Sequence, residues 1–419
     1  MNIFKKEELG ISELEMKEAS RKVKEISGKI KSVFKKKKIK AELFIGGSFA
    51  KGTLLKKEKY DVDLFVRFDK KEEDISKKLY NALKQVFKDL KVIKGSREYF
   101  SVMLNDKIEL EIIPVRKISN PKKAENVTDL SYFHVNYVKR KLKSGMALEV
   151  LLAKKFCDSS GLYGAESYIQ GFSGYALECL IIHYKTFEKF LKAVVRVEDR
   201  IVLDPEKMYK NKKEILIELN ESKTQNKVVL VDPTWKERNV LAALSEESFK
   251  KFQEIAKKYL KSKDKDKFFR KKEVDESDFE IKARKMNAEF VKVVISTEKQ
   301  EGDIAGTKMK KFANFLVQEI SKYYELREKE FEYGNGRTSK LLLIVKPRKE
   351  ILKAGPPVEM KDAVLRFKGL NGKTFVKSGR VYSKVVFNKK SVDFLKDWIS
   401  SKNGKRQIEE MGMSRTIVS

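Results

Sequence analysis

The sequence predicts an α+β protein of several domains, with an N-terminal α/β domain, a helical middle domain and a mixed α/β C-terminal region. Its 419 residues exceed what one hydrophobic core usually holds. Helix-like and strand-like patterns alternate over the first 140 residues, whereas residues 141–270 carry mainly the 3.6-residue period of helices. Both patterns return after residue 270. We therefore expect domains at 1–140, 141–270 and 271–419.

In the first domain, short helices and strands follow one another, which is typical of a compact α/β unit. Ile26, Ile30, Val33 and Phe34 fall at helical spacing, with lysines on the other side. The predicted elements are a helix at 12–38, strands at Ala41–Ile45 and Val62–Phe68, a helix at Glu72–Leu90, and a strand at Ile108–Ile113 that Pro114 ends.

The rest of the chain has fewer clear boundaries. Gly174 precedes an apolar helix that contains His183 and Cys179, and we interpret both as packing residues, like Cys157. The lysine-rich segment 207–227 is predicted to be a solvated loop or insertion with a strand in it. The C-terminal predictions are strands near Phe290–Ser296 and Leu341–Val345, a helix near Lys308–Tyr324, and a hairpin at Lys373–Phe387.

The charge and the rare residue types limit the function. A formal net charge of +32 favours a polyanionic partner, and nucleic acid is the first candidate. The alternative is a lysine-rich proteome or a need for solubility. Two cysteines and two histidines give no disulfide framework and no zinc cluster, so a metal would need carboxylate ligands. Without an apolar leader or an 18-residue apolar run, we expect a cytoplasmic protein with no membrane segment.

Two predicted strands carry acidic residues on one face. Asp61 and Asp63 are two residues apart and therefore point to the same side, opposite Val62 and Leu64. Glu109 and Glu111 repeat this pattern on the strand at 108–113. If the two strands pair, at least three carboxylates come together, and their repulsion is relieved by a hard cation such as Mg²⁺. Such a set is the equipment of two-metal phosphoryl or nucleotidyl transfer.

The segment GGSFAKGT, Gly46–Thr53, follows the first strand and precedes the two aspartates. A Gly-Gly-Ser turn lets backbone N–H groups approach a phosphate, and Ser48 adds a hydroxyl donor. Lys51 adds positive charge nearby. The spacing of a Walker A loop is absent. Alone, such a turn or an Asp-x-Asp pair is more often structural, but the joint pattern predicts a nucleotidyltransferase site.

These motifs resemble the polymerase beta-type nucleotidyltransferase superfamily. Four further stretches resemble the archaeal-type, class I CCA-adding enzymes, which are tRNA nucleotidyltransferases. They are SYFHVNYV, KKFCDSSGLYGAESYIQGFSGYALECLIIHY, VDPTWKERNVLAALS and GPPVEMKDAVLRF, at 131–138, 154–184, 231–245 and 355–367. The resemblance covers nearly the whole chain, and the stretches after residue 130 are more family-specific than the catalytic motif.

The resemblance implies a role for each matching residue. Asp61, Asp63 and Glu111 match the three catalytic metal carboxylates, although the family usually has aspartate at the third position, which leaves Glu109 as a substitute. Gly47 and Ser48 match the triphosphate turn. The other nucleotide-binding matches are Ser131 and His134 for a Thr-x-x-His pair, Lys154 and Tyr163 for the phosphates, and Arg238 for the incoming base. From residue chemistry alone, a histidine such as His134 is more often structural, and Tyr163 is also interpretable as a packing residue. Residue chemistry alone favours a surface ion pair of Arg238 with Glu237 or a neighbouring residue.

The implied activity is template-independent addition of C, C and A to the tRNA 3′ end, from CTP and ATP with two Mg²⁺ ions, releasing pyrophosphate. The 1–140 domain is then catalytic, residues 141–270 bind nucleotide and RNA, and residues 271–419 bind tRNA. A basic surface with Arg366, Lys373, Lys377 and Arg380 is a candidate to hold the acceptor arm, and ordinary solvated charge is the alternative. A homodimer is an open expectation. The alternatives are a poly(A) polymerase-like or oligoadenylate synthetase-like enzyme, and a degenerate tRNA-binding protein.

Overall fold

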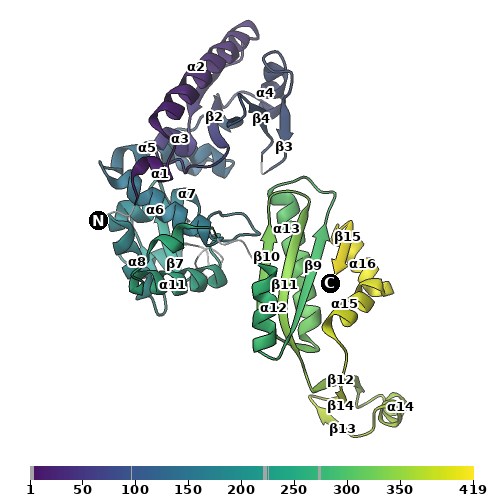
Figure 1. Ribbon diagram of the computed structural model, residues 1–419. Coiled ribbons are helices and arrows are strands. Elements are labelled where there is room, and N and C mark those ends of the chain that lie inside the picture. The colour runs from purple at the N-terminus through teal and green to yellow at the C-terminus, as the bar shows by residue number, and fades with distance from the viewer. Residues whose placement is uncertain (1–3, 96, 220–223, 225, 272–274) are drawn as a thin grey trace. The chain divides into compact units, whose positions relative to one another are not determined.

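A computed structural model of the chain (Figure 1) describes residues 4–95, 97–219, 224, 226–271 and 275–419. The chain divides into two compact units, Met1–Lys272 and Glu273–Ser419. The predicted α+β class is confirmed, since helices and sheets occur in both units. The predicted boundary at residue 140 lies inside the first unit, and the three-domain division stays a prediction.

The first unit begins with a mixed sheet of order β1-β2-β5-β4-β3. Only β2 and β5 run parallel, while the other neighbours are antiparallel. The strands are β1 (Ala41–Ile45), β2 (Tyr60–Phe68), β3 (Lys91–Ile93), β4 (Tyr99–Met103) and β5 (Ile108–Arg116), with helices α1 (Lys6–Leu9), α2 (Glu13–Lys36), α3 (Gly47–Lys51) and α4 (Ile75–Leu83). The predicted strands at 41–45, 62–68 and 108–113 and the helix at 12–38 are confirmed, and the helix at 72–90 is shorter than predicted.

One face of this sheet is covered by α2 and α4. Helix α2 begins at a capping box formed by Ser12 and Glu15, and α4 begins after Asp74, whose carboxylate accepts from the Lys77 N–H. Their apolar sides join Val62, Leu64, Val66, Phe68 and the facing residues of β5 in one buried cluster. Burying this face anchors β2 and β5, because a one-residue slip would turn every apolar side chain outward. The acidic residues are thereby held on the other face.

The prediction that Pro114 ends the third strand is wrong, because β5 continues to Arg116. Proline lacks an N–H, so it fits a strand only where no partner needs that donor. The Lys107 carbonyl and the Lys117 N–H bond to β2, so even-numbered residues between them face β4. Pairing with β4 ends at Ile112, and the Pro114 carbonyl accepts instead from Arg97. Pro114 therefore leaves no ladder bond unmade.

The remainder of the first unit is mainly helical. The elements are 3-10 turns η1 (Pro121–Lys123), η2 (Val127–Leu130) and η3 (Asp266–Phe269), helices α5 (Ser131–Lys141), α6 (Met146–Ser159), α7 (Gly174–Tyr184), α8 (Phe187–Val195), α9 (Lys212–Glu218) and α11 (Glu246–Lys261), and strands β6 (Ile201–Leu203), β7 (Val228–Asp232) and β8 (Trp235–Asn239). The helices share a core rich in aromatic rings, including Phe156, Phe187 and Phe252. Cys157 and Cys179 are buried and free, as predicted.

The predicted strand within 207–227 is wrong where the structure describes that segment. Residues 220–223 and 225 lie outside the described residues, but Lys212–Glu218 forms helix α9. The Asn211 side chain accepts from the Glu214 N–H and caps this helix. Ile215 and Leu219 turn inward and pack on Val229 and Val231 of β7. The spacing of four residues between Ile215 and Leu219 is helical, but the consecutive apolar residues 215–217 resemble a short strand.

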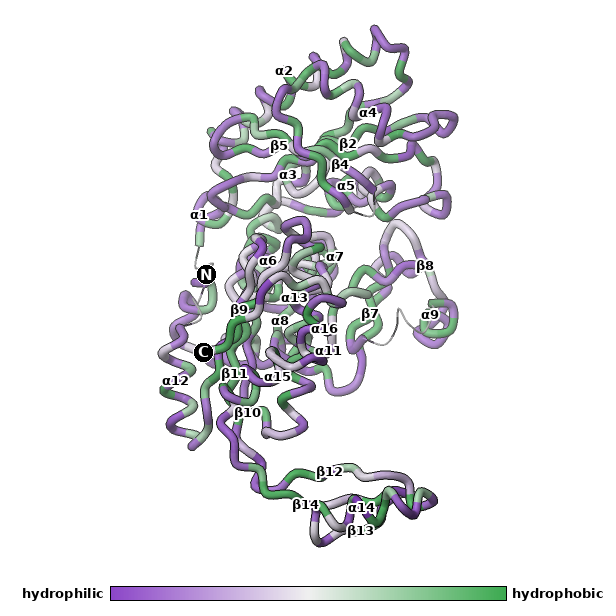
Figure 2. Tube along the Cα trace, turned by 90° about the vertical axis from the view of Figure 1, so that its right-hand side faces the viewer, coloured by the Kyte–Doolittle hydropathy of each residue, from purple (hydrophilic) through white to green (hydrophobic). Residues whose placement is uncertain are grey.

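The second unit has an antiparallel sheet of order β10-β11-β9-β15, with α13 and α15 packed on one face and α12 on the other. After β11 the chain enters a smaller sheet of order β12-β14-β13, on which α14 packs. Figures 1 and 2 show this smaller sheet set apart from the larger one. The bounds are α12 (Glu276–Lys285), β9 (Glu289–Ser296), α13 (Asp303–Ser321), β10 (Tyr324–Tyr333), β11 (Thr338–Pro347), β12 (Glu350–Pro357), α14 (Lys361–Asn371), β13 (Thr374–Lys377), β14 (Arg380–Val386), α15 (Ser391–Ser400), α16 (Lys402–Glu410) and β15 (Arg415–Val418).

The predicted elements of the second unit are confirmed. The strands near 290–296 and 341–345 are β9 and β11, the helix near 308–324 is α13, and the hairpin at 373–387 is formed by β13 and β14. Ser378 and Gly379 occupy the turn of this hairpin with positive φ. Across the described part of the chain, no helix has both the length and the apolar character needed to cross a bilayer.

Candidate active site

Acidic side chains from β2 and β5 share one face of the sheet, which we call the acid face: Asp61, Asp63, Glu109 and Glu111. The parallel register places Asp61 beside Glu109 and Asp63 beside Glu111. The strand pairing on which the sequence prediction depended is therefore present. Adjacent strands lie about 4.8 Å apart, so these carboxylates repel one another.

This crowding and the burial of the site raise the pKa values of three of these carboxyl groups. Burial, followed by the charges of Asp63 and Asp61, raises the pKa of Glu111 to about 8. Burial also raises the pKa of Asp63 to about 6, against the opposing charge of Lys51, and it raises the pKa of Asp61. Raised carboxyl pKa values at one place mean that the site lacks compensating positive charge. A bound cation would supply that charge.

The chemistry of the donor set fits a hard divalent metal, because carboxylate oxygens are the ligands that Mg²⁺ prefers. Lys57 is the nearest basic partner of Asp61, with 3.9 Å between its Nζ and Oδ2 of Asp61, and its side chain is half exposed. Within the described ranges, no three acidic, histidine or cysteine side chains are already arranged so that they could hold a metal ion. The acid face thus offers ligands on adjacent strands rather than a preformed cage.

Glu109 and Glu111 differ in their surroundings. The Ser101 hydroxyl on β4 donates to the Glu109 carboxylate. In the part of the chain that the structure describes, no side chain donates to Glu111. Its pKa is set by burial and by the charges around it. Glu111 is therefore the better third ligand beside Asp61 and Asp63, and Glu109 is already engaged. The assignment of all three stays a prediction.

The Gly-Gly-Ser segment lies directly on the acid face. The Gly46 N–H donates to the Asp63 carbonyl at 2.8 Å, and Gly47 begins α3 with φ +60°. Instead of an open turn, this segment forms the first turn of that five-residue helix. The Ser48 hydroxyl has no hydrogen-bond partner among the described residues. Gly46 and Gly47 are therefore adjacent to Asp63, and Ser48 is the next residue of α3.

Lys51 and Lys154 meet at one buried carboxylate, Glu178 on α7. The Lys51 ammonium lies 2.5 Å from Oε2 of Glu178, and Lys154 donates to Oε1 at 2.9 Å. Lys154 also donates to the Thr53 carbonyl and hydroxyl, and Thr53 donates to Glu178. Burial alone would raise the pKa of Glu178, but the two lysines and Thr53 lower it to about 2. We call these residues the Glu178 group.

The Glu178 group links α3 and the loop after it to α6 and α7. Lys154 is 1% exposed and its three ammonium hydrogens each have a partner, so in this arrangement it binds protein rather than a phosphate. Tyr163 lies beside it: a β-carbon at Gly174 would be 3.0 Å from the Tyr163 hydroxyl and 3.5 Å from Nζ of Lys154. The structure therefore brings Lys154 and Tyr163 together, as the sequence hypothesis requires.

His134 and Arg238 meet at another buried carboxylate, Asp232, the last residue of β7. Nε2 of His134 lies 3.1 Å from Oδ2 of Asp232, and Arg238 donates to the same oxygen at 2.6 Å. Tyr175 donates to Oδ1, and its ring stacks on His134 with 4.0 Å between ring centroids. Arg238 thus pairs with Asp232 and not with Glu237, which pairs with Lys122. Ser131 begins α5, one turn before His134.

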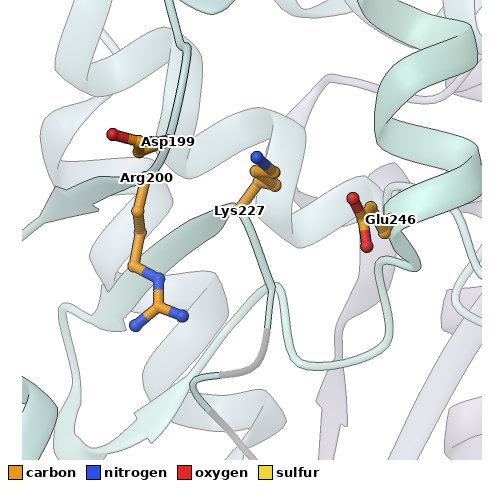
Figure 3. Close-up of a pocket in the computed structure, with 4 residues that line it drawn as sticks. All are labelled: Asp199, Arg200, Lys227 and Glu246. Carbon is orange, nitrogen blue, oxygen red and sulfur yellow. The ribbon is translucent and has the colours of Figure 1, made fainter.

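Two pockets lie in the first unit. One, of about 370 Å³, is lined by Asp199, Arg200, Lys227 and Glu246 (Figure 3). Its two acidic and two basic side chains give no net charge to attract a triphosphate, and none was a candidate residue. The other, of about 240 Å³, is lined in part by Phe133, the chain neighbour of His134, and by Thr234, which lies in the β7–β8 turn and donates to Asp232.

Comparison with known proteins identifies the family. Residues 148–270 match the family described as "tRNA nucleotidyltransferase, second domain", and residues 2–131 match the "Second Messenger Oligonucleotide or Dinucleotide Synthetase domain". The chain is 35% identical over 285 residues to a CCA-adding enzyme of Nanoarchaeum equitans, which covers 67% of each chain. The chain belongs to the CCA-adding enzyme family.

A second CCA-adding enzyme, from Saccharolobus shibatae, is 33% identical over 251 residues, covering 59% of this chain and 58% of that relative. The match thus spans less than two thirds of the second relative's length. A solved structure titled as the Cid1 poly(U) polymerase bound to Mg 3′-dATP covers 64% of this chain at 16% identity and a TM-score of 0.49. That likeness is too distant to add to the argument.

For this CCA-adding family member, sequence reasoning missed four residues of the site: Thr53, Tyr175, Glu178 and Asp232. Glu178 had a signal, since a lone acidic residue inside the apolar helix YALECLIIHY needs a buried partner. Asp232 had a weaker signal, because it ends the apolar segment VVLVD just before a Pro-Thr turn. Thr53 and Tyr175 had none, since their roles depend on partners more than fifty residues away.

Proposed function

We propose that this chain adds C, C and A to the 3′ end of immature or damaged tRNA without a template, using CTP and ATP and releasing pyrophosphate. One observation supports this most: Gly47 and Glu111 both lie against Asp63 in a chain 35% identical over 285 residues to a CCA-adding enzyme. The nucleophile is the tRNA 3′ hydroxyl, which attacks the α-phosphate of the incoming nucleotide. No covalent enzyme intermediate is needed.

Asp61, Asp63 and Glu111 would hold two Mg²⁺ ions. When bound, such ions lower the pKa of an attacking hydroxyl and stabilise the negative charge of a leaving pyrophosphate. The raised pKa values of Asp63 and Glu111 support this role, because a cation would return both carboxyls to their ionised form. Glutamate at position 111 reaches further than the aspartate that is usual in the family, and Ser101 holds Glu109 away from that task.

The triphosphate is proposed to bind at α3 and beside the Glu178 group. The Gly47 backbone would provide a donor next to Asp63, and the Ser48 hydroxyl would provide another from the next residue of α3. Lys51 and Lys154 carry two positive charges against one negative charge on Glu178, which leaves one net positive charge. Tyr163 adds a hydroxyl beside Lys154. Lys154 therefore acts mainly through the field of this group while its hydrogens remain bonded to protein.

His134 and Arg238 are proposed to contact the sugar and the base. Burial lowers the pKa of His134, so its ring is neutral at pH 7. The ionised Asp232 beside Nε2 requires a proton on that nitrogen, which leaves Nδ1 as an acceptor. An acceptor suits a ribose hydroxyl better than a phosphate oxygen. Ser131, one turn earlier on α5, adds a hydroxyl to this side of the site.

The tRNA acceptor arm is proposed to bind basic surfaces through its phosphates. Lys373, Lys377 and Arg380 are exposed around the β13–β14 hairpin, and Arg366 lies nearby in sequence on α14. This surface and the net charge of +32 allow such binding without an apolar interface. The homodimer and the cytoplasmic location remain predictions.

Template-free extension tests the proposal. A tRNA transcript ending at its discriminator base is incubated with Mg²⁺ and CTP, ATP or both, and the products are resolved at single-nucleotide length. We expect two additions with CTP alone, three with both nucleotides, and then a stop. The Asp63→Ala variant should bind tRNA but add nothing. Equal extension by the wild type and this variant would refute the catalytic assignment.

A second candidate has one observation in its favour, the match of residues 2–131 to an oligonucleotide synthetase domain. An oligonucleotide synthetase would form short oligonucleotides from ATP alone, without any tRNA. A poly(A) polymerase would form a long ladder of A on generic RNA, also from ATP alone. The match ends at residue 131, the first residue of α5, whereas His134, Lys154, Tyr163 and Arg238 lie beyond it. Tight tRNA binding with no addition of any nucleotide would instead indicate a degenerate binding protein.

A further inference from the structure

Asp232 has more polar partners than any predicted site residue, and it is fully buried. Its Oδ1 accepts from Tyr175 at 3.0 Å and from the Thr234 N–H and hydroxyl, both at 2.8 Å. Its Oδ2 lies 2.6 Å from Nη1 of Arg238 and 3.1 Å from Nε2 of His134. A buried carboxylate without partners would be costly, so this one is held in place by donors from α5, α7 and the β7–β8 hairpin.

We propose that Asp232 is a positioning residue that makes the nucleotide site accept C and A and reject U and G. The inference rests on the proposed function, and it concerns how bases are distinguished rather than how they are joined. Asp232 itself need not touch the base. It would act through Arg238, whose guanidinium it orients, and through His134, whose protonated nitrogen it selects.

Arg238 is the first route. Its side chain is 23% exposed, and among the described residues Asp232 is the acceptor that it pairs with. The planar guanidinium carries five N–H donors in fixed relation, so holding Nη1 also fixes the plane of the other donors. An arginine without such a partner would sample several rotamers on the hairpin. The pairing with Asp232 therefore presents a rigid set of donors to a ligand.

Base chemistry explains what a rigid donor set can read. Cytosine and adenine share a pattern on their pairing edge, an amino donor next to an unprotonated ring nitrogen. Uracil and guanine have the reverse, a carbonyl next to a ring N–H. A fixed arginine donor can bond to the ring acceptor of C or A but meets another donor in U or G. Two donors that face each other in a site without water weaken binding, because neither has an acceptor. The site would therefore reject U and G by repulsion.

His134 is the second route. Asp232 requires the proton on Nε2, and the Tyr175 ring stacked at 22° holds the imidazole plane. Without the carboxylate, the proton can occupy either nitrogen, and Nδ1 can change from acceptor to donor. The same carboxylate thus keeps a donor at Arg238 and an acceptor at His134. Loss of the Asp232 charge would leave neither the Arg238 donor nor the His134 acceptor fixed in place.

The test is nucleotide selectivity in the full-length protein. We would measure kcat/KM for CTP, ATP, UTP and GTP on tRNA primers of matched length, together with tRNA affinity and thermal unfolding, for the wild type and Asp232→Asn. Asparagine keeps the shape but can turn a donor toward His134 or Arg238. We expect kcat/KM for CTP to fall about 10- to 100-fold and the CTP:UTP ratio to fall by at least about 10-fold, as for a lost charged hydrogen bond. Affinity for tRNA should hold.

Two further variants complete the design. Tyr175→Phe removes one donor to Asp232 but keeps the stacked ring, so it serves if Asp232→Asn does not fold, and it should lower the CTP:UTP ratio by a few-fold. Asp266→Asn breaks an exposed Asp–Arg pair and should change nothing. An equal loss with all four nucleotides, leaving the ratio unchanged in the folded Asp232 or Tyr175 variant, overturns the proposal. A wild type that adds neither C nor A refutes the proposed function instead.

Discussion

Gly47 lies so close to Asp63 that a β-carbon at position 47 would fall 1.6 Å from Oδ2 of the Asp63 carboxylate. This proximity explains why a glycine pair precedes the aspartates in the sequence. The backbone must pass over the carboxylate without a side chain, and Gly47 also adopts a φ of +60° that favours glycine. The start of α3 and the acid face are therefore one site, assembled from segments sixteen residues apart.

Gly47→Ala should strongly lower the rate of nucleotide addition while leaving most of the fold intact. The new methyl group must displace the Asp63 carboxylate, which moves a predicted metal ligand. We expect a loss of kcat of at least about 100-fold, in line with misplacement of reacting groups by an ångström. Gly52→Ala is the matched control, because Gly52 has a φ of +67° but open space around it. It carries the same backbone strain, about 1 kcal/mol, without the collision. Equal activity in both variants would contradict the role of Gly47.

Glu111→Gln and Glu109→Gln form a second matched pair. Both remove one negative charge from the acid face, but only Glu109 accepts from Ser101. We expect Glu111→Gln to lower the rate of addition by about 1,000-fold or more, the scale of losing a few kcal/mol of transition-state stabilisation. Glu109→Gln should cost less than about 10-fold. Single-turnover extension measures both. A reversed order of the two losses would make Glu109 the third ligand.

The acid face should link stability, pH and Mg²⁺. Asp63 and Glu111 have folded pKa values of about 6 and about 8, above the ordinary carboxyl range. A raised folded pKa stabilises the fold at low pH, and this contribution is lost as the pH rises through those values. Metal-free protein should therefore lose stability between about pH 4 and pH 8, if other groups are equal.

Added Mg²⁺ should reverse this loss. Because protons compete with the metal for the same oxygens, Mg²⁺ should raise the melting temperature more at pH 8 than at pH 6. At a concentration 100-fold above its dissociation constant, a ligand of the native state adds about 2.7 kcal/mol. Thermal unfolding with and without Mg²⁺, at constant ionic strength, measures the effect. Asp63→Ala should show little response. The same Mg²⁺ response in this variant would place the metal elsewhere.

The acid face could be predicted from sequence because its information is local. The alternation of Asp61, Val62 and Asp63 along one strand indicates that the two aspartates share a face. Burial of Val62 on the opposite face fixes this orientation. The same reasoning failed at Pro114, because a proline is tolerated where the neighbouring strand has ended, and sequence does not reveal where that is. Helix α9 was missed because the consecutive apolar residues Ile215, Leu216 and Ile217 resemble a short strand, although Ile217 is exposed.

The Glu178 group and the partners of Asp232 could not be predicted in the same way. Lys51 and Glu178 are 127 residues apart, and His134 and Asp232 are 98 apart. Each pair depends on how α3, α5, α7 and β7 pack, which no periodicity encodes. The family resemblance located His134, Lys154 and Arg238 but not the buried carboxylates that hold them. For Arg238, residue chemistry alone favours a surface ion pair with Glu237 or a neighbouring residue, whereas the structure pairs it with the buried Asp232.

Glu178→Gln should destabilise the protein strongly. It leaves Lys51 and Lys154 buried with no negative partner, and breaking a buried ion pair from one side costs about 3–5 kcal/mol. Glu188→Gln, which breaks an exposed pair with Lys192, should cost less than about 0.5 kcal/mol. Urea unfolding at pH 7 measures both. A loss of less than about 1 kcal/mol for Glu178→Gln would mean that the lysines find other partners or water.

The pH dependence gives this prediction a second readout. The folded pKa of Glu178 is about 2, below its ordinary value of 4.5. A lowered folded pKa adds stability above pH 4.5, and this contribution is lost as the pH falls from 4.5 toward 2. The difference between the wild type and Glu178→Gln should therefore shrink over that range. A difference that stays constant down to pH 2 would mean that the carboxylate charge is not what stabilises the group.

The β13–β14 hairpin should contribute to tRNA binding and not to nucleotide binding. Replacing Lys377 and Arg380 by glutamine removes two exposed charges beside a turn whose backbone does not depend on them. We expect the KM for tRNA to rise and the salt dependence of tRNA binding to weaken by about 0.9 in slope for each phosphate that is no longer neutralised. The KM for CTP should not change. Lys282 and Lys285, exposed on α12, provide a control pair for the loss of two charges. If both pairs weaken tRNA binding equally, the effect belongs to net charge and the hairpin is not a specific surface.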